Sequence, residues 1–338
     1  MHSLFKQCEL FLNGSKIGDN LHYSYRSYID TLVGFSNDAK KSHLSSVNYE
    51  PKKLSTLKKV PGQDYRNLNL IGVLHMDPCF QGKSFIGGLA CKLVLYPNPP
   101  KFYFTTVESG PDAVVEYIDA SLYLHRSKVS SDLLVAHQRA LAQTPARYPM
   151  TRTEVKMVTL HKGSIDATID NIVLGQLPRR MFVCFVGHDE CNGNKTKNPL
   201  EFKHFNVNYL CAFLGGDQYP RKAYTPNFRE GNFVRKFTEL YRSINQLSTD
   251  CTCAIDQAAF ENGSTVFGLN FAPDLSDGAS LIGHTNVIKH GALRLMVKFE
   301  NSLEEAINVV CYMEFDSLIE IDANRKVMID RFNENPRN

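Results

Sequence analysis

The sequence predicts an all-β protein with a few helices, built as two similar halves. Its apolar runs are mostly short and are bounded by glycine, proline, asparagine or aspartate, which is typical of β-sandwiches and barrels. Each half holds an apolar strand broken by a dipeptide that tolerates positive φ, Asn13-Gly14 in the first half and Gly215-Gly216 in the second. These turns lie roughly 200 positions apart, which indicates a duplicated domain.

Further matches follow downstream at a similar offset and in the same order. The matched segments are 72–77 with 268–274, 88–95 with 291–297, and the long apolar strands 117–124 with 307–315. One β-domain used twice explains this order, whereas chance similarity between β-rich segments is the alternative. We therefore expect equivalent strands at equivalent places in the two halves.

Helices are expected at three places among these strands. Apolar residues at helical spacing over 23–34 end at Gly34, and a short second helix starts at Ser36, so helical structure is expected over about 23–44. Asn232 caps a helix over 232–247 in the second half, and a helix over 131–143 joins the halves.

Prolines after this joining helix mark a domain boundary, because proline restricts the residue before it to extended geometry. With the boundary near residue 150, the first domain comprises residues 1–150 and the second 151–330, followed by a polar tail at 331–338.

The second half carries strands that the first half lacks. Strands at 153–160, 165–174 and 180–186 precede its hairpin, whereas the first half begins almost at its hairpin. If the halves are copies, about 50 residues of strands are missing from the first domain. We expect an N-terminally truncated first domain with unpaired strand edges, an uncovered apolar face, and faster amide exchange in 1–130 than in 151–330.

Charge and cysteine content exclude several classes of protein. The net charge is only +3, which is too small for a protein that binds nucleic acid tightly, and basic pairs such as Lys40-Lys41 are expected on a solvated face. Nine cysteines without a signal peptide indicate free thiols in a reducing compartment. No apolar run reaches the roughly 18 residues of a membrane span. We expect an intracellular protein that is not secreted.

Two short clusters contain potential metal ligands. His188-Asp189-Glu190-Cys191 places four in a row, but zinc sites use spaced pairs, so a polar hairpin loop is the better interpretation. Cys251-Thr252-Cys253 has no second pair at zinc spacing. We therefore predict no metal site.

The carboxylates offer no catalytic pair. Asp77 and Asp274 end strands at matching positions, which predicts turn formation rather than catalysis. Four carboxylates late in the chain are expected to share one solvated face: Glu314, Asp316, Glu320 and Asp322. There is no glycine-rich phosphate loop and no nucleophile beside a base. We predict no catalytic and no cofactor-binding residue, and hence no enzyme.

Several long stretches resemble one known family. They are residues 1–5 (MHSLF), 10–17 (LFLNGSKI), 23–32 (YSYRSYIDTL), 170–180 (DNIVLGQLPRR), 231–237 (GNFVRKF) and 307–330 (INVVCYMEFDSLIEIDANRKVMID). These stretches resemble the major capsid protein of Polintons, virus-like transposons also called Mavericks, and the hexon-type protein of the related adintoviruses. The resemblance runs from residue 2 to about residue 330.

The resemblance implies a double jelly-roll, two eight-stranded barrels side by side, which assembles as a homotrimer of pseudo-hexagonal outline. It implies a non-enzymatic role in a virion, with the trimer packed in a capsid lattice beside a penton or minor capsid protein. Related proteins have further strands before the stretch at 1–5, and this chain departs from the pattern there.

On this interpretation the loops at 45–66 and 187–203 are available for contacts between subunits. The alternative is a host-adopted or degraded capsid-derived interaction protein that no longer assembles. An enzyme would depend only on His188–Cys191.

Overall fold

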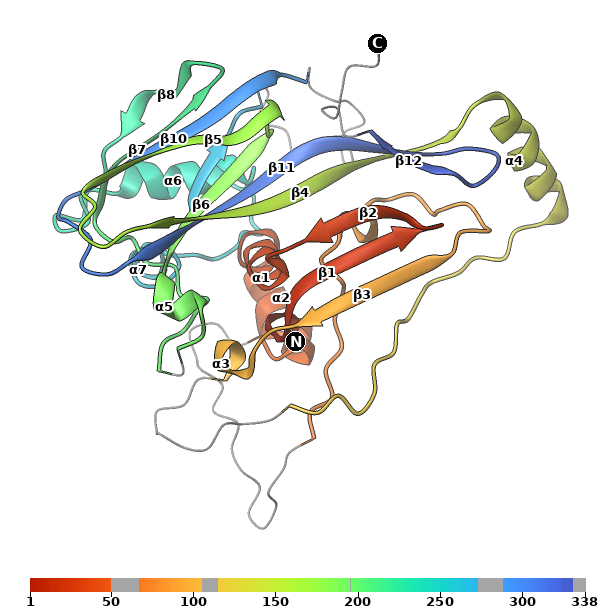
Figure 1. Ribbon diagram of the computed structural model, residues 1–338, viewed down its shortest axis with the longest axis horizontal. Coiled ribbons are helices and arrows are strands. Elements are labelled where there is room, and N and C mark those ends of the chain that lie inside the picture. The colour runs from red at the N-terminus through yellow and green to blue at the C-terminus, as the bar shows by residue number, and fades with distance from the viewer. Residues whose placement is uncertain (50–66, 105–114, 195, 273–287, 331–338) are drawn as a thin grey trace.

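The described part of the chain contains three antiparallel β-sheets (Figure 1). The computed structural model describes residues 1–49, 67–104, 115–194, 196–272 and 288–330. The smallest sheet has the order β2 (Ser15–Asn20), β1 (Phe5–Leu12), β3 (Cys91–Pro97). The second has the order β5 (Asp166–Gln176), β10 (His290–Phe299), β7 (Val207–Leu214), β8 (Asp217–Tyr224). The third contains β12 (Val327–Asp330), β11 (Ile307–Ile321), β6 (Arg180–Gly187) and β9 (Phe267–Asn270), with β4 (Ala146–Leu160) on the other edge of β11.

The helices are short and lie between these strands. In chain order the α-helices are α1 (Tyr23–Gly34), α2 (Asn37–Lys41), α3 (Pro100–Tyr103), α4 (Ser131–Gln143), α5 (His188–Cys191), α6 (Val234–Ser243) and α7 (Gln257–Glu261). The described residues also form the 3₁₀ turns η1 (His2–Leu4), η2 (His43–Val47) and η3 (Asp77–Cys79). None of the helices within the described ranges is long and apolar enough to cross a membrane.

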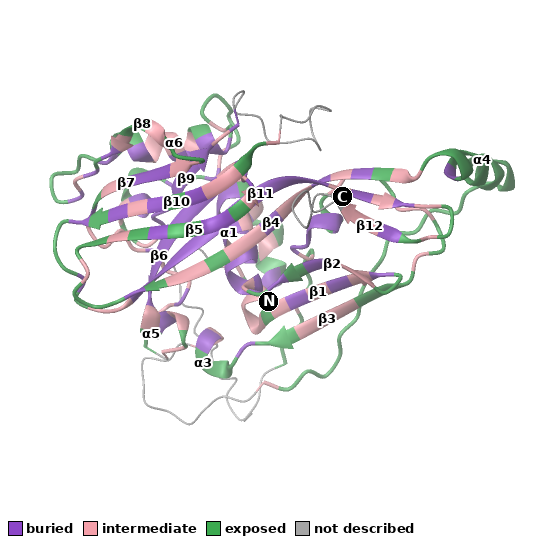
Figure 2. Cartoon of the chain, turned by 45° about the horizontal axis from the view of Figure 1, so that its top comes forward, coloured by how far each residue is buried: buried purple, intermediate pink, exposed green. Residues whose placement is uncertain are grey.

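Strands β4 to β11 form a jelly-roll. One of its sheets has the order β4-β11-β6-β9 and the other the order β5-β10-β7-β8, which is the eight-stranded, two-sheet arrangement of that fold. The predicted alternation in β10 is confirmed, because Leu293, Leu295 and Val297 are fully buried while Arg294 and Lys298 are exposed (Figure 2). The inner faces of the two sheets make the larger core.

The smallest sheet repeats part of this jelly-roll. Its order β3-β1-β2 corresponds to β10-β7-β8, with a two-residue turn in each hairpin. Asn13 and Gly14 have φ of 47° and 80°, and Gly215 and Gly216 have φ of 59° and 103°. These values are the positive φ that tight hairpins require, and the predicted turns are confirmed. Helix α1 follows the first hairpin as α6 follows the second, so the described strands keep the order of the internal repeat.

The long strands β4 and β11 take part in both cores. They pair over their whole length, from Leu160 opposite Ile307 to Ala146 opposite Ile321. Near Leu160 and Ile307 the two strands line the larger core. Toward Ala146 and Ile321 they cover the apolar face of the smallest sheet. The residues of this smaller core are Cys8, Leu10, Leu12, Ile17, Tyr23, Met76, Tyr148, Met150, Ile319, Ile321 and Val327. The expectation of an uncovered apolar face was therefore wrong.

The predicted domain boundary near residue 150 falls inside β4, and the division into two domains stays a prediction.

Some predicted elements match closely and others do not. Helix α4 has the predicted bounds, and the Ser36 hydroxyl accepts the Ala39 N–H at 3.2 Å as expected of a cap. Helix α6 instead begins at Val234, without a side-chain cap from Asn232. Residues 117–124 form no strand, because no neighbouring strand pairs with them in the described part of the chain. Asp274, the tail 331–338 and most of the loop 45–66 lie outside the described residues.

Candidate functional site

A buried network of polar side chains joins the smallest sheet to the long strands. At its centre, Arg26 of α1 is 2% exposed, and its Nη2 donates to Oδ1 of Asp77 at 2.5 Å. Its Nη1 donates to Oδ1 of Asn20, at the end of β2, at 2.8 Å. The Asp77 carboxylate also accepts the backbone N–H of Thr153 in β4 at 3.0 Å. We call this network, with the residues added below, the polar joint.

Asp30 extends the polar joint to β11. Its Oδ1 accepts the hydroxyl of Tyr312 at 2.5 Å, and its Oδ2 lies 2.9 Å from Nδ1 of His75. The same oxygen lies 3.6 Å from Nε of Arg26. Contacts thus run from α1 and η3 to both long strands, so the polar joint fixes how the two halves sit against each other.

Burial and charge act in opposite directions on the two carboxylates of the polar joint. Burial raises the pKa of Asp77, although the adjacent Arg26 guanidinium favours its charged form. Burial also disfavours ionisation of Asp30, but its hydrogen bond with His75 and the charge of Arg26 hold its pKa below the ordinary value. Burial beside Asp30 raises the pKa of Tyr312 well above its usual range, so its hydroxyl stays a donor. Every charge here depends on a partner from another element, which favours one arrangement of the halves.

A second buried contact between the halves involves Lys40. Its Nζ donates to the carbonyl of Leu32 at 2.7 Å and to that of Cys253 at 2.8 Å. The predicted solvated position of Lys40 was therefore wrong, because its ammonium closes the end of α1 and reaches the other half of the chain. Burial lowers its pKa to about 8.

The late carboxylates do not share one solvated face, contrary to the prediction. Glu314 is buried in β11, and its two carboxylate oxygens accept hydrogen bonds from Nη2 of Arg179 at 3.0 Å and from Nε and Nη2 of Arg180 at 2.9 and 2.8 Å. Asp316 is also buried, with its Oδ1 4.0 Å from Nη1 of Arg179. Glu320, paired with the exposed Arg147 at 2.8 Å, and Asp322, whose Oδ1 accepts the Lys326 N–H at 2.8 Å, are the two that remain partly exposed. The arginines come from the resembling stretch 170–180, and they neutralise a charge on the jelly-roll sheet.

The predicted loop at His188–Cys191 is a short helix, α5, which holds structural contacts. Glu190 is fully buried, accepts the backbone N–H of Gly187 at 3.3 Å and pairs with Nζ of Lys203 at 2.7 Å. Cys251 is exposed and Cys253 is buried. Over the ranges that the structure describes, no three histidine, cysteine or acidic side chains gather in a way that could hold a metal ion.

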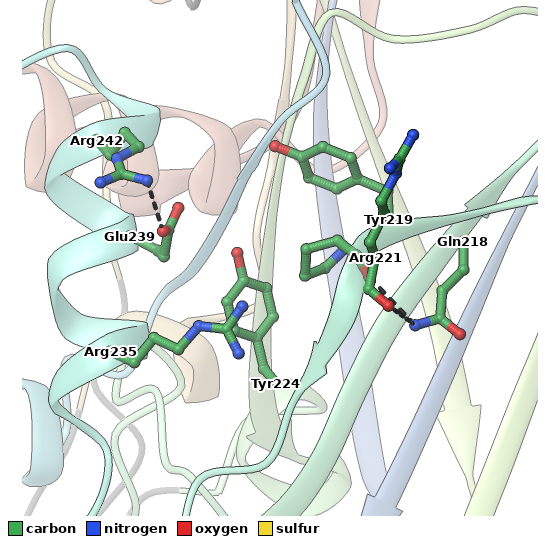
Figure 3. Close-up of a pocket in the computed structure, with 8 residues that line it drawn as sticks. Gln218, Tyr219, Arg221, Tyr224, Arg235, Glu239 and Arg242 are labelled. Atoms are coloured by element: carbon green, nitrogen blue, oxygen red, sulfur yellow. Dashed lines mark hydrogen bonds and ion pairs between the residues drawn. The ribbon is translucent and has the colours of Figure 1, made fainter.

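A shallow cleft of about 480 Å³ lies between β8 and α6 (Figure 3). Arg221, Arg235 and Arg242 line it together with Tyr219 and Tyr224. Two of these guanidinium groups already have partners within the chain. Arg242 pairs with Glu239 at 3.1 Å, and Arg235 donates to the carbonyls of Ala223 and Lys222 at 3.3 and 3.1 Å. The cleft is therefore basic; Arg235 joins α6 to β8, whereas the Arg242–Glu239 pair lies within α6.

Many apolar side chains are exposed on the segment that joins the two halves along the chain, which comprises residues 115–130 and α4 and which we call the arm. Residues 116–130 are exposed along their whole length, and α4 stands away from the sheets (Figures 1 and 2). In α4 only Leu141 is buried, while Leu133, Leu134 and Val135 face solvent. The arm therefore presents apolar side chains to solvent that none of the described sheets covers.

Sequence reasoning missed the polar joint. The sequence feature that could have predicted it is the pair Arg26 and Asp30. These are opposite charges one helical turn apart, and they lie beside the apolar Tyr25 and Ile29. Charges on the apolar side of a helix require buried partners. Those partners, however, come from sequence positions far from the helix.

Comparison with known proteins agrees with the fold. No family model matches the chain. An uncharacterized protein of Caenorhabditis elegans is 23% identical over 342 residues, which cover 97% of this chain and 80% of that protein. The Sputnik virophage structure at 3.5 Å superposes with a TM-score of 0.52 and 11% identity, covering 97% of this chain and 74% of that chain. The PBCV-1 virus capsid superposes with a TM-score of 0.50 and 10% identity, covering 97% and 84%.

These likenesses define the class of fold. The protein is a mostly β double jelly-roll with a few helices, as the resemblance implied. The larger jelly-roll is formed by β4 to β11, and the smallest sheet supplies the corresponding strands of the other.

Proposed function

We propose that this chain is a structural, non-enzymatic capsid protein that assembles as a homotrimer in the virion of a Polinton-like virus. The observation that carries the proposal is the double jelly-roll in which β4 and β11 extend through both cores, since two such units held rigidly together form a building block for a lattice. The likeness to the PBCV-1 capsid and to the Sputnik virophage supports it. The resembling stretches at 10–17 and 307–330 support the Polinton assignment.

The proposed partners are further copies of the chain, a capsid lattice and a penton or minor capsid protein. Identical chains commonly associate with closed symmetry, and a trimer of double jelly-rolls gives six similar units around one axis. Before assembly, the proposed location is inside the cell. Neither a specific nucleic acid nor a metal is part of the proposal.

Sedimentation at micromolar concentration tests the proposal. A species of threefold mass supports it, as do shells seen by electron microscopy. A monomer that persists as the concentration is raised would refute assembly.

A second candidate is a capsid-derived interaction protein that no longer assembles. The smallest sheet favours it, because among the described residues β3 has no partner on its outer edge, whereas the corresponding β10 pairs with β5. On this proposal the monomer is stable and binds a different protein.

A further inference from the structure

The cleft between β8 and α6 contains positive charge that the fold leaves without a partner. Its lining includes three guanidinium groups and one carboxylate, that of Glu239, which gives a net charge of +2. The side chain of Arg221 is exposed, and no described residue accepts a hydrogen bond from its guanidinium or forms an ion pair with it. The side-chain amide of Gln218 donates to the carbonyl oxygens of Pro220 and Arg221 at 3.2 and 3.0 Å, so the backbone that carries this guanidinium is held in place (Figure 3).

A second donor without a partner lies inside the cleft. Tyr224 is only 4% exposed and lines the cleft, yet its hydroxyl makes no hydrogen bond with any described residue (Figure 3). Burial and the nearby Glu239 carboxylate raise the pKa of Tyr224 above its ordinary value, so the hydroxyl keeps its proton and remains a donor. A polar group in such surroundings is costly to leave without a hydrogen bond, and the acceptor atom of a ligand removes that cost.

Two cations of α6 hold this tyrosine in position. The guanidinium of Arg235 lies over the Tyr224 ring, 4.8 Å from the ring centroid, and Nζ of Lys236 lies 3.8 Å from the same centroid. The Nη atoms of Arg235 are also fixed, because they donate to two carbonyl oxygens of β8. The donors around the cleft are therefore ordered before any ligand binds, which lowers the entropy cost of binding.

The arrangement of these donors favours phosphate over carboxylate. Arginine suits both anions, because its fork of N–H groups donates to two oxygens at once. In this cleft, however, donors stand on both walls, with Arg221 and Tyr224 on β8 and two arginines on α6. A carboxylate presents two oxygens in one plane, whereas a phosphate presents three that point in different directions and can reach both walls.

Charge and size agree with a phosphate monoester. Such a group carries about −1.5 to −2 charges at neutral pH, which balances the net charge of the lining. The cleft volume of about 480 Å³ also leaves room for the organic part of the ester beside the phosphate.

We propose that the cleft between β8 and α6 binds a phosphate monoester. The phosphate oxygens accept hydrogen bonds from the guanidinium of Arg221 and the hydroxyl of Tyr224, the two groups that lack partners of their own. Arg235 and Arg242 add positive charge from the opposite wall. The inference does not rest on the proposed assembly of the chain.

Calorimetric titration with inorganic phosphate and with adenosine monophosphate tests the site. Ionic strength is kept constant with chloride, and the pH is held well above the second phosphate pKa of about 6. Both probes should bind the parent protein, whereas acetate should not bind measurably. Acetate binding as tight as that of phosphate would refute the phosphate assignment.

Three variants locate the binding. Arg221→Gln should raise the dissociation constant at least about tenfold, and Tyr224→Phe about threefold to tenfold, because each removes one donor. The matched control is Lys222→Gln, which removes an exposed positive charge next to Arg221 from a side chain outside the lining and should change binding less than about twofold. All three variants should melt at the parent temperature, since no described contact of a guanidinium, hydroxyl or ammonium is lost.

The remaining outcomes decide against the proposal. If Arg221→Gln and Lys222→Gln weaken binding equally, general surface charge attracts the anion and the site is refuted. A single-stranded oligonucleotide with unphosphorylated ends carries phosphodiesters only. If it binds more tightly than the monoester and Arg221→Gln abolishes that binding, the ligand is a nucleic-acid backbone and the monoester is refuted. If neither phosphate probe binds the parent, the inference fails while the proposed function stands.

Discussion

The polar joint gives the sharpest test of how the two halves are held together, through the variant Asp77→Asn. This change keeps the size of the side chain and removes its charge, which leaves Arg26 buried at 2% exposure. Asp30 still lies 3.6 Å from Nε of Arg26, so part of the compensation remains. Breaking a buried ion pair by removing one partner costs about 3–5 kcal/mol, and the remaining carboxylate places the expected cost near the lower end, about 3 kcal/mol.

Urea unfolding measures this cost directly. A loss of about 3 kcal/mol should also lower the melting temperature by roughly 4 °C in a chain of this size. The control is Glu320→Gln, which breaks an ion pair whose Arg147 side chain is 66% exposed and should therefore change stability by less than about 0.5 kcal/mol.

A double variant separates the charge from the shape of the site. In Arg26→Met/Asp77→Leu both partners are apolar, so no unpaired charge is buried between them, and the protein should be more stable than Asp77→Asn alone. If Asp77→Asn is no more destabilising than Glu320→Gln, the polar joint does not hold the halves, and the reasoning fails.

Two further predictions concern the buried Lys236 and the residues that could have bound a metal. Burial lowers the pKa of Lys236 to about 7 from 10.5, although its Nζ lies 3.8 Å from the Tyr224 ring centroid. The unfolded chain therefore binds a proton that the folded chain lacks between these pH values, and stability should rise with pH across this interval. Lys236→Met should flatten the rise and stabilise the protein at pH 7; equal pH dependence of parent and variant in thermal melts would contradict this. A chelator should leave the melting temperature unchanged, whereas a fall of several degrees would show that Cys251-Thr252-Cys253 or His188–Cys191 holds a metal.

Elements set by neighbouring residues could be predicted from the sequence. The turn at Asn13-Gly14 depends on two residues that tolerate positive φ, and the cap of α2 depends on the hydroxyl of Ser36 three positions before the N–H of Ala39. The same holds for the alternation of β10, because a sheet with one buried face imposes a period of two. Each of these signals is complete within a few residues.

Features that depend on distant residues could not be predicted. Glu314 lies on a strand whose alternation suggested a solvated face, but Arg179 and Arg180 of β6 and the turn before it cover that position. Residues 117–124 have the pattern of a strand, and yet a strand exists only where another strand pairs with it. Local pattern thus gives the chemistry of a segment and not the identity of its neighbour.

The long strands explain how a three-stranded sheet can be stable in this protein. At about 3.3 Å per residue, the fifteen residues of β4 or β11 reach roughly 50 Å, several times the separation of packed layers. One strand pair can therefore line the larger core and still cover β1 and β2 through Tyr148 and Ile319. Because the same pair also bears Thr153 and Tyr312 of the polar joint, the smallest sheet is held by apolar and charged contacts from one rigid support. The stability of the first half thus depends on strands of the second, so damage to β4 or β11 should loosen both cores together.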